Sequence, residues 1–194
     1  MLRIGIFSGT FDPVHNGHIA FCRTALQACK LDQVVLIPEE VPRAKQLVTP
    51  LEHRLLMLAL ATQDDHKLSV TRLATPQFTV SQTLPELRRH FPGAELTLLL
   101  GSDVAKTFAY RWPQLEILLG QLELAIGLRH GDNPDAIAVL MRRLQETYGV
   151  PVRFTCLQSP HARAASSGVR SGHRNTVDPK VTDYIARNDL YASH

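Results

Sequence analysis

The sequence predicts a doubly wound α/β fold, in which helices cover both faces of a mostly parallel sheet within a single domain, residues 1–194. Short apolar runs typical of buried strands alternate along the chain with segments of helical period. No internal repeat or low-complexity linker interrupts this alternation. Hydrophobic residues make up 44% of the chain, which is enough for one sizeable core. We therefore expect βα units that share one sheet.

Each element is predicted from its own local pattern. Strands are expected where runs of Val, Ile and Leu are bounded by turn residues, near 2–7, 33–37, 67–73, 95–100, 122–128 and 150–157. Helices are expected where apolar residues recur every three or four positions, at 16–30, 51–62, 81–91, 134–148 and 178–189. The most polar stretches, 38–50 and 131–134, are predicted loops, and the first is long enough to act as a lid.

The turn between the first strand and the first helix, residues 9–18, has the composition of a phosphate site. Gly9 and Gly17 let the backbone come close to a ligand. His15 and His18 are three residues apart, which in a first helical turn places both imidazoles on one face. The first N–H groups of a helix have no internal partners and attract anions. Taken singly, each histidine is equally typical of a helix cap or a packed core residue.

In full, this turn reads Gly-Thr-Phe-Asp-Pro-Val-His-Asn-Gly-His and resembles the signature of His-x-x-His nucleotidyltransferases. This ten-residue sequence is most similar to the motif of the nicotinate-mononucleotide adenylyltransferase family, because pantetheine-phosphate adenylyltransferases usually carry Thr at the position of His15. The resemblance implies a Rossmann-like fold with His15 and His18 as catalytic residues. It also implies that ATP is bound by Gly9, Thr10, Phe11 and Gly17.

Two further segments resemble phosphate-binding motifs of that family. Pro42-Arg-Ala-Lys45 is similar to a Pro-Pro-His-Lys loop without its His, which implies that Lys45 contacts phosphate; the alternative is an ordinary solvated lysine. Residues 164–170 resemble Ile-Ser-Ser-Thr-x-Ile-Arg, which implies ATP binding by Ser166 and Ser167 and a catalytic Arg170. A guanidinium can hold two phosphate oxygens at once and keeps its charge.

The fourth predicted strand ends in Gly101-Ser-Asp103, which resembles the family's Gly-x-Asp. Ligands of open α/β sheets gather at the carboxyl ends of strands, and a carboxylate there can accept both hydroxyls of a ribose. The resemblance implies that role for Asp103 and ATP binding by Gly101; a helix N-cap is the alternative for Asp103. Arg129 ends the next apolar run, where the family often has an arginine near the nucleotide.

Two residues are candidates for binding the mononucleotide. Thr79 lies in a segment, 78–84, that resembles the family's Tyr-Thr-x-Asp-Thr-Leu but lacks the Asp. The alternative is that Thr79 and Thr83 are only a strand end and a helix cap. Trp112, the only tryptophan, occupies a stretch similar to one in which an aromatic face stacks on the pyridine ring. Core packing explains Trp112 equally well. Residues 52–57 also match the family and consist mostly of helix core residues.

The resemblance implies adenylyl transfer from ATP to nicotinate mononucleotide, with Mg²⁺ arriving on ATP and no covalent enzyme intermediate. Two alternatives remain open. The altered segment 78–84 allows another acceptor, such as nicotinamide mononucleotide or pantetheine phosphate. The missing loop His and a shortened stretch after Arg170 allow a nucleotide-binding sensor without turnover. No set of residues has the spacing of a protein-held metal site.

Composition excludes several other classes. The net charge is only +3, and the one basic region, with six Arg or Lys against two Asp between residues 153 and 187, is explained by the phosphate motif, so no nucleic-acid partner is expected. Three cysteines without motif spacing favour a reducing compartment. No leader-like or long apolar segment is present. We expect a cytoplasmic protein without membrane contact, and an oligomer is compatible with the sequence.

Overall fold

Six parallel strands form one sheet in the computed structural model, which describes residues 1–42, 47–110, 112–158, 166–172 and 176–191. The strand order is β3-β2-β1-β4-β5-β6, and every neighbouring pair is parallel. The strands are β1 Arg3–Gly9, β2 Gln33–Pro38, β3 Leu68–Val70, β4 Glu95–Gly101, β5 Glu123–Leu128 and β6 Phe154–Gln158. The predicted parallel α/β sheet is confirmed.

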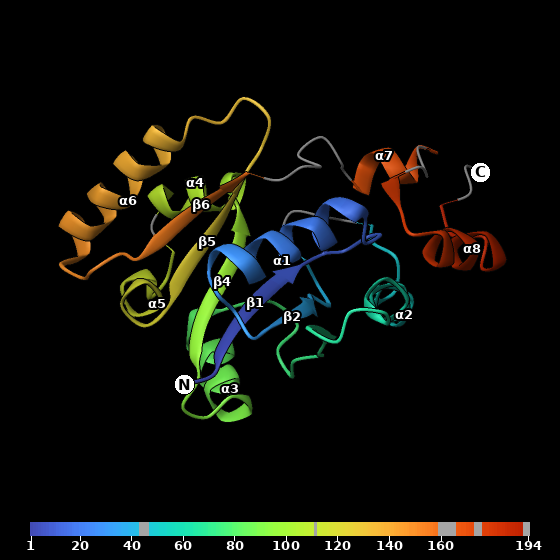
Figure 1. Cartoon of the computed structure of the whole chain (residues 1–194), viewed down its shortest axis with the longest axis horizontal. Helices are drawn as coiled ribbons and strands as arrows, with labels where there is room; N and C mark the ends of the chain where they lie inside the picture. The colour runs from blue at the N-terminus through green and yellow to red at the C-terminus, as the bar shows by residue number, and fades with distance from the viewer. Residues whose placement is uncertain (43–46, 111, 159–165, 173–175, 192–194) are drawn as a thin grey trace.

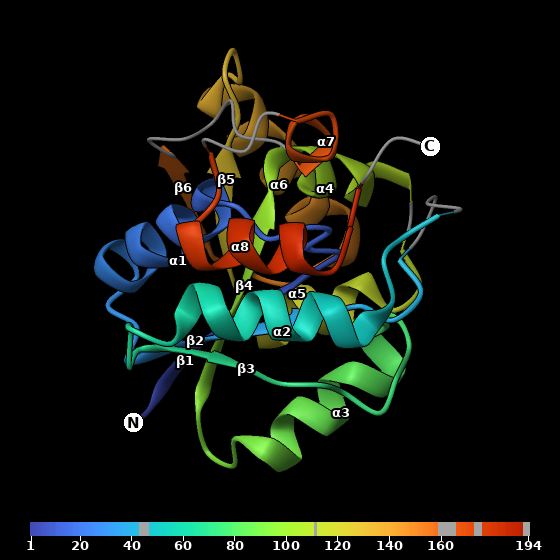
Figure 2. The same cartoon turned by 90° about the vertical axis from the view of Figure 1, so that its right-hand side faces the viewer.

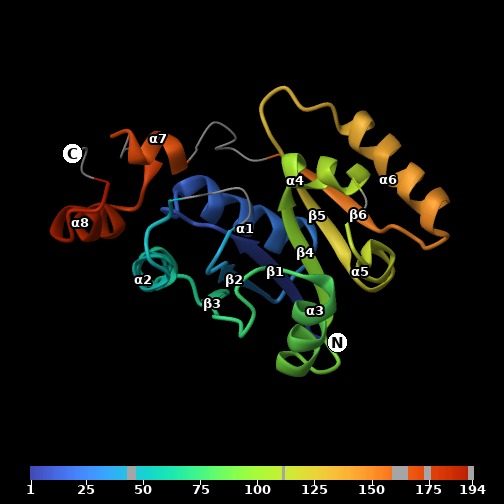
Figure 3. The ribbon, with the colours of Figure 1, turned by 180° about the vertical axis from the view of Figure 1, so that it is seen from behind.

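Helices pack on both faces of this sheet (Figures 1 and 3). One apolar core holds residues of α3 Val80–His90, α4 Ser102–Thr107, α5 Leu115–Gln121 and α6 Pro134–Tyr148. The other holds residues of α1 Asn16–Ala28, α2 Leu51–Thr62, α7 Ser166–Arg170 and α8 Pro179–Arg187. A 3₁₀ turn, η1 Phe108–Tyr110, follows α4. No helix in the described part of the chain is long and apolar enough to cross a membrane.

The strands divide their side chains between the two cores. In β1, Ile6 belongs to the α3–α6 side and Phe7 to the opposite side. In β4, Leu98 and Leu99 alternate in the same way. Successive strand residues point to opposite faces, so a strand covered on both faces needs apolar residues at consecutive positions. The near-continuous apolar runs that predicted these strands are a consequence of this double burial.

Element boundaries depart from the prediction at several places. The third strand is only Leu68–Val70 rather than 67–73, because the chain continues into the polar, proline-containing segment 71–77 at the edge of the sheet. The sixth begins at Phe154, after Pro151. The short helices α4, α5 and α7 were not predicted. Each has too few turns to establish a 3.6-residue period, and packing against the sheet stabilises them instead.

The site lies where the strand order reverses. β1 and β4 are neighbours, yet β1 leads outward to β2 and β3 while β4 leads outward to β5 and β6. Because all strands are parallel, their carboxyl ends share one edge, and Gly9 and Gly101 end the two central strands there. Ligands of open α/β sheets bind at this topological switch point. The two predicted motifs, residues 9–18 and 101–103, therefore meet at one edge.

The end of the chain returns to this region. Helix α8 lies alongside α2 on the outside of the fold (Figure 2). The Tyr184 hydroxyl of α8 is 2.8 Å from His53 Nδ1 of α2, and Lys180 Nζ is 2.5 Å from an Asp64 carboxylate oxygen. These contacts fix α8 against α2, and the turn after α8 carries Tyr191 back to the first motif.

Candidate active site at the β1–β4 edge

Phe11 shapes the turn that carries the two histidines. Its φ of 48° lies in the left-handed region, which costs a non-glycine residue roughly 1–2 kcal/mol. Its buried ring packs edge-on against Phe7 at 5.2 Å and His18 at 5.1 Å between centroids, and this burial offsets the strain. A Cβ added at Gly9 would come within 3.2 Å of the Phe11 ring. Gly9 is thus needed for a close approach of backbone to ring.

His15 and His18 lie together, as predicted. Their rings stack at 3.6 Å between centroids with an interplanar angle of 22°. His15 is the N-cap of α1 rather than a residue of its first turn, and its side chain is buried. The His15 backbone N–H donates to His18 Nδ1 over 3.1 Å. A neutral His18 then carries its proton on Nε2. His18 combines both roles considered from the sequence, because one ring nitrogen caps the helix and the other is a donor.

Helix α1 adds a positive end to this turn. It has 13 residues and no acidic residue in its first turn, so no side chain there neutralises the N-terminal dipole. Gly17 is buried in that first turn. The backbone N–H groups of the first turn and the Nε2 nitrogen of His18 share one end of α1, which is the arrangement expected of a phosphate site.

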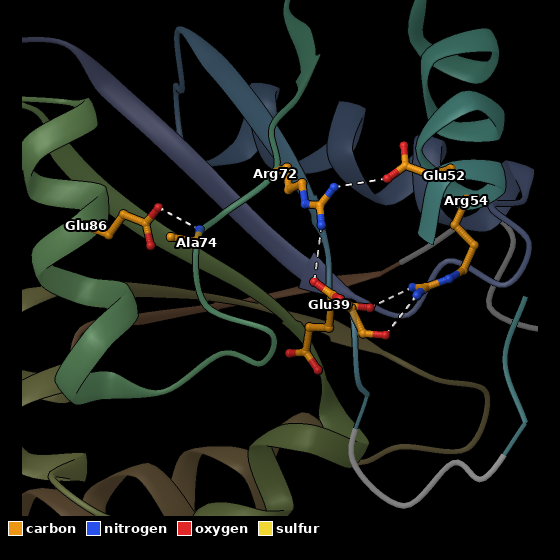
Figure 4. A network of polar contacts seen from close by, with 7 residues as sticks. Glu39, Glu52, Arg54, Arg72, Ala74 and Glu86 are labelled. Carbon is orange, nitrogen blue, oxygen red and sulfur yellow. Dashed lines mark hydrogen bonds and ion pairs between the residues drawn. The ribbon is translucent and has the colours of Figure 1, made fainter. Parts of the chain in front are cut away.

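Arg54 of α2 holds the β1–α1 turn in place through a hydrogen bond to its backbone. Its side chain is completely buried, and it donates hydrogen bonds of 2.7 to 3.1 Å to backbone carbonyl groups (Figure 4). These carbonyls belong to Thr10, Glu39, Glu40 and Thr49. Burial lowers the pKa of Arg54 from its ordinary value, and the neighbouring Asp12 carboxylate opposes this shift. Arg54 therefore ties the first motif to the end of β2 and to the start of α2.

Arg54 was missed because its segment was interpreted as helix core. The signal was present: Arg54 falls on the same helical face as Leu51, Met57 and Leu58, all of which are buried. A single charged residue on an apolar face is expected to have buried polar partners. Its partners are carbonyl groups of the β1–α1 turn and of the loop between β2 and α2, and this pairing cannot be identified from local sequence.

Asp12 joins three parts of the chain. One carboxylate oxygen accepts the Thr49 backbone N–H at 3.2 Å, and the other accepts the Tyr191 hydroxyl at 2.5 Å. Its backbone carbonyl accepts Arg170 Nη1 at 2.6 Å. Asp12 therefore holds the turn through partners from distant segments.

The second phosphate motif lies directly against the first. The Ser166 hydroxyl donates to the Pro13 carbonyl at 2.9 Å, and Arg170 donates to the carbonyl of Asp12. Ser167 is exposed on α7 between them. Residues more than 150 positions apart in the sequence are therefore in direct contact at this edge of the sheet.

The other half of the site is an ion pair at the ends of β4 and β5. Arg129 Nη2 lies 2.9 Å from Asp103 Oδ2, and each side chain is about half exposed. Gly101 is the N-cap of α4, so the alternative N-cap role of Asp103 is wrong; Asp103 lies in the first turn. A Cβ on Gly101 would be 2.3 Å from Asp103 Oδ1, so only glycine lets this carboxylate fold back over the strand end.

Asp132 anchors the loop that follows β5. It accepts the Arg129 backbone N–H at 2.6 Å, Lys106 Nζ at 2.6 Å and the Ser102 hydroxyl. These bonds, that of Lys106 foremost and that of Ser102 next, lower the pKa of the Asp132 carboxyl to about 2. Asp132 connects α4 to the loop bearing Arg129. Nothing in its local sequence pattern distinguished it from other loop carboxylates.

The candidate mononucleotide residues have structural partners. Thr79 is the N-cap of α3, and its backbone N–H donates to Thr83 Oγ1 at 2.9 Å. The segment before Thr79 is held by the buried Glu86, whose carboxylate accepts the Ala74 N–H (Figure 4). Trp112 packs edge-on against Phe108 at 5.0 Å, and its Nε1 donates to Thr107 at 3.1 Å.

Thr79 therefore occupies the N-cap position of α3 but makes no side-chain capping hydrogen bond there, and the packing role of Trp112 is present. The contacts of both residues with substrate stay predictions. Lys45 lies outside the described residues.

Comparison with known proteins agrees with this geometry. A family model described as cytidylyltransferase-like matches residues 6–170. A probable nicotinate-nucleotide adenylyltransferase of Neisseria meningitidis serogroup C is 31% identical over 202 residues, covering 98% of this chain and 99% of the relative. The chain belongs to the nicotinate-nucleotide adenylyltransferase family. A family member of Clavibacter michiganensis is 42% identical over 106 residues, 53% of this chain and 52% of its own.

Solved structures share the fold of this family member. Plasmodium falciparum nicotinic acid mononucleotide adenylyltransferase complexed with NaAD superposes with a TM-score of 0.77 at 18% identity, covering 98% of both chains. A putative nicotinate-nucleotide adenylyltransferase from Vibrio parahaemolyticus gives 0.63 at 17% identity, covering 100% of this chain and 98% of the other. The predicted fold class and family are thus confirmed, and the chain is a nucleotidyltransferase.

The Asp132 anchor of this adenylyltransferase-family chain is expected to make stability depend on pH. The carboxyl titrates near pH 3.8 when unfolded and at about 2 when folded, so its contribution is present above pH 4 and lost as the pH falls from about 4 to 2. Asp132→Asn is expected to lower the free energy of unfolding by about 1–2 kcal/mol at pH 7.

Urea unfolding of both proteins from pH 7 to pH 2 measures this difference, which should shrink toward zero at the acid end. Asp183→Asn, at an exposed position of α8, serves as the control. A constant difference between wild type and Asp132→Asn at every pH would contradict the assignment.

Proposed function

We propose that this chain transfers the adenylyl group of ATP to nicotinate mononucleotide and releases pyrophosphate and nicotinate adenine dinucleotide. The observation that carries the proposal is the meeting of the His15–His18 turn, the Arg170 motif and the Asp103 strand end at one switch point of the sheet. The family membership and the fold agree with it.

The reaction is an in-line displacement at phosphorus. An oxygen of the mononucleotide phosphate attacks the α-phosphorus of ATP, and the bond from that phosphorus to the oxygen bridging to the β-phosphate breaks as pyrophosphate leaves. The attacking phosphate is already ionised at neutral pH, so no general base is needed. The enzyme has to position two anions and stabilise the charge that builds on the phosphoryl oxygens.

The cationic and donor groups of the first and last motifs supply this stabilisation. The N–H groups at the start of α1, with Gly9, Thr10, Phe11 and Gly17, form the backbone part of the ATP site. His15 and His18 donate from the same turn, and Arg170, Ser166 and Ser167 approach from α7. Lys45 is assigned to the same cluster from its motif alone. The contacts of Ser166 and Arg170 with residues 12 and 13 support this grouping.

Asp103 is proposed to bind the ribose of ATP, with Arg129 beside the nucleotide. Their ion pair, about half exposed, is of the kind that contributes little to stability, so a ligand can replace it at small cost. On ATP binding the ribose hydroxyls would take over the Asp103 oxygens and release Arg129 toward the nucleotide. Asp132 keeps the Arg129 backbone in place throughout this exchange.

The acceptor is proposed to lie near Thr79 and Trp112. Trp112 is half-buried, and its packing against Phe108 gives the ring a fixed orientation. A fixed aromatic face suits the flat pyridine ring, which offers few other groups to hold.

Magnesium is proposed to enter with ATP. Within the part of the chain that the structure describes, no group of three or more His, Cys, Asp or Glu side chains could hold a metal ion. We propose that the phosphates of the substrate and water molecules would hold the Mg²⁺ ion. The chemistry it supplies is neutralisation of charge on the β- and γ-phosphates.

Pyrophosphate release with ATP and Mg²⁺ tests the proposal, with nicotinate mononucleotide, nicotinamide mononucleotide and pantetheine phosphate compared at equal concentration. A strong preference for the nicotinate compound is expected. Preference for either other acceptor would reassign the substrate. If calorimetry shows ATP binding but no acceptor supports pyrophosphate release, the proposal of an enzyme is wrong and a nucleotide-binding sensor takes its place.

A further inference from the structure

Tyr191 places a hydroxyl group inside the first motif from the far end of the chain. Helix α8 ends at Arg187, and the following turn, closed by a hydrogen bond from the Leu190 N–H to the Ile185 carbonyl, includes Asp189 at φ 48°. Tyr191 itself has φ 62°. Two left-handed residues in so short a segment reverse the chain sharply. The reversal brings the Tyr191 hydroxyl to 2.5 Å from Asp12 Oδ1.

The partner of Tyr191 is a buried carboxylate. Asp12 is 3% exposed, and its two oxygens have different donors, the Tyr191 hydroxyl and the Thr49 N–H. Asp12 thus links Thr49 and Tyr191, and the three residues form one polar cluster. Burial and the bond to Asp12 raise the pKa of Tyr191, which keeps the phenol protonated as a donor.

This cluster borders the catalytic turn. Asp12 is three residues before His15, and only Pro13 and Val14 separate them. Thr49 lies at the end of the loop that carries Lys45 and also accepts Arg54 through its carbonyl. A buried oxygen that loses its donor costs roughly 1–3 kcal/mol, and a carboxylate more. Without the phenol hydroxyl, Asp12 would have to turn toward water, and the residues on either side of it would move.

We propose that Tyr191 is a positioning residue for adenylyl transfer, which acts through Asp12 to hold the turn that bears His15 and His18. The inference rests on the proposed function, because it assigns to that turn the stabilisation of the phosphoryl group. A displacement of about 1 Å in such a turn can cost about 100-fold in rate. The free energy of unfolding does not depend so steeply on the position of these two imidazoles.

Tyr184 provides a matched comparison. It is a second tyrosine of the same C-terminal segment, it is also partly buried, and its hydroxyl also hydrogen-bonds, but to His53 on α2. Removal of that hydroxyl weakens the attachment of α8 without touching the catalytic turn. A difference between Tyr191→Phe and Tyr184→Phe therefore isolates the contact with Asp12 from the docking of α8.

The experiment measures kcat and KM for ATP and for nicotinate mononucleotide, together with thermal unfolding, on the full chain and both variants. We expect Tyr191→Phe to lower kcat about 10- to 100-fold, with KM for ATP changed less than about threefold. Tyr184→Phe is expected to stay within about twofold of the wild-type kcat. Wild-type kcat in Tyr191→Phe, or equal losses in both variants, would overturn the proposal.

A second measurement separates this inference from the proposed function. Side-chain ¹⁵N NMR of the histidines reports the environment of His15 and His18 without any turnover. These two signals should shift in Tyr191→Phe and stay in place in Tyr184→Phe; unchanged signals in Tyr191→Phe would overturn the proposal. A wild-type protein inactive with every acceptor would instead refute the proposed function, while the NMR comparison would still decide the positioning role.

Coupling between the two partners gives a further check. Asp12→Asn and Tyr191→Phe disrupt the same contact, so the double variant is expected to lose no more kcat than the more impaired single variant. Additive losses would show that the two residues act separately and would overturn the proposal.

Discussion

Replacement of His18 by alanine is expected to lower kcat about 10²–10³-fold while the chain stays folded. The physical reason is the loss of a donor that meets the developing charge on the phosphoryl oxygens. His18 Nδ1 accepts the His15 N–H, so the donor nitrogen is Nε2. A change limited to that interaction should appear in kcat more than in the KM for ATP.

Two further variants separate the roles of the His18 ring. His18→Asn keeps a side-chain oxygen that can accept the His15 N–H but lacks a donor at the position of Nε2, so it should be as slow as His18→Ala and more stable. His66→Ala, at an exposed position before β3 and away from the site, is the control for loss of an imidazole. Equal turnover by wild type and His18→Ala would refute the assignment of His18.

Replacement of Arg54 by methionine is expected to lower the free energy of unfolding by about 3–5 kcal/mol. Methionine preserves much of the side-chain volume but leaves backbone carbonyl groups of two loops without this donor. Arg54→Lys retains the charge but cannot reach all of these carbonyls in a planar fork, so an intermediate loss is expected. Urea unfolding followed by circular dichroism measures both.

Arg72 is the matched control for Arg54. It lies close by and forms ion pairs with Glu40 and Glu52, but its side chain is 51% exposed (Figure 4). Exposed pairs of this kind contribute about 1 kcal/mol or less, so Arg72→Met should change stability little. Similar losses in the Arg54 and Arg72 variants would contradict the role given to the buried guanidinium.

Local pattern predicted the central part of the site well. The motif at residues 9–18 contains its own geometry, because a strand end, two glycines and a helix start determine where His15 and His18 can lie. Gly101 and Asp103 were found for the same reason, since a strand end and a turn place both within three residues. In each case the interacting groups are close in sequence, so their spacing carries the structural information.

Other site residues depend on contacts between distant segments. Arg54, Asp132 and Tyr191 each have a partner that lies more than 20 residues away, and Tyr191 and Asp12 are separated by 179 positions. Such a pairing leaves no periodic pattern in either segment. Only the burial of a charged or hydroxyl group on an otherwise apolar face hints at it, as with Arg54 on α2.

By itself, the sequence determined the parallel α/β sheet, the family and the place of the turn proposed to bind phosphate, because hydrophobic period and a ten-residue motif are local properties of the chain. Tertiary structure alone decided how the site is held together. The buried Asp12 carboxylate and the buried Arg54 guanidinium require partners that offset their desolvation cost, and the fold supplies these from the β1–α1 turn, the loop between β2 and α2 and the turn after α8.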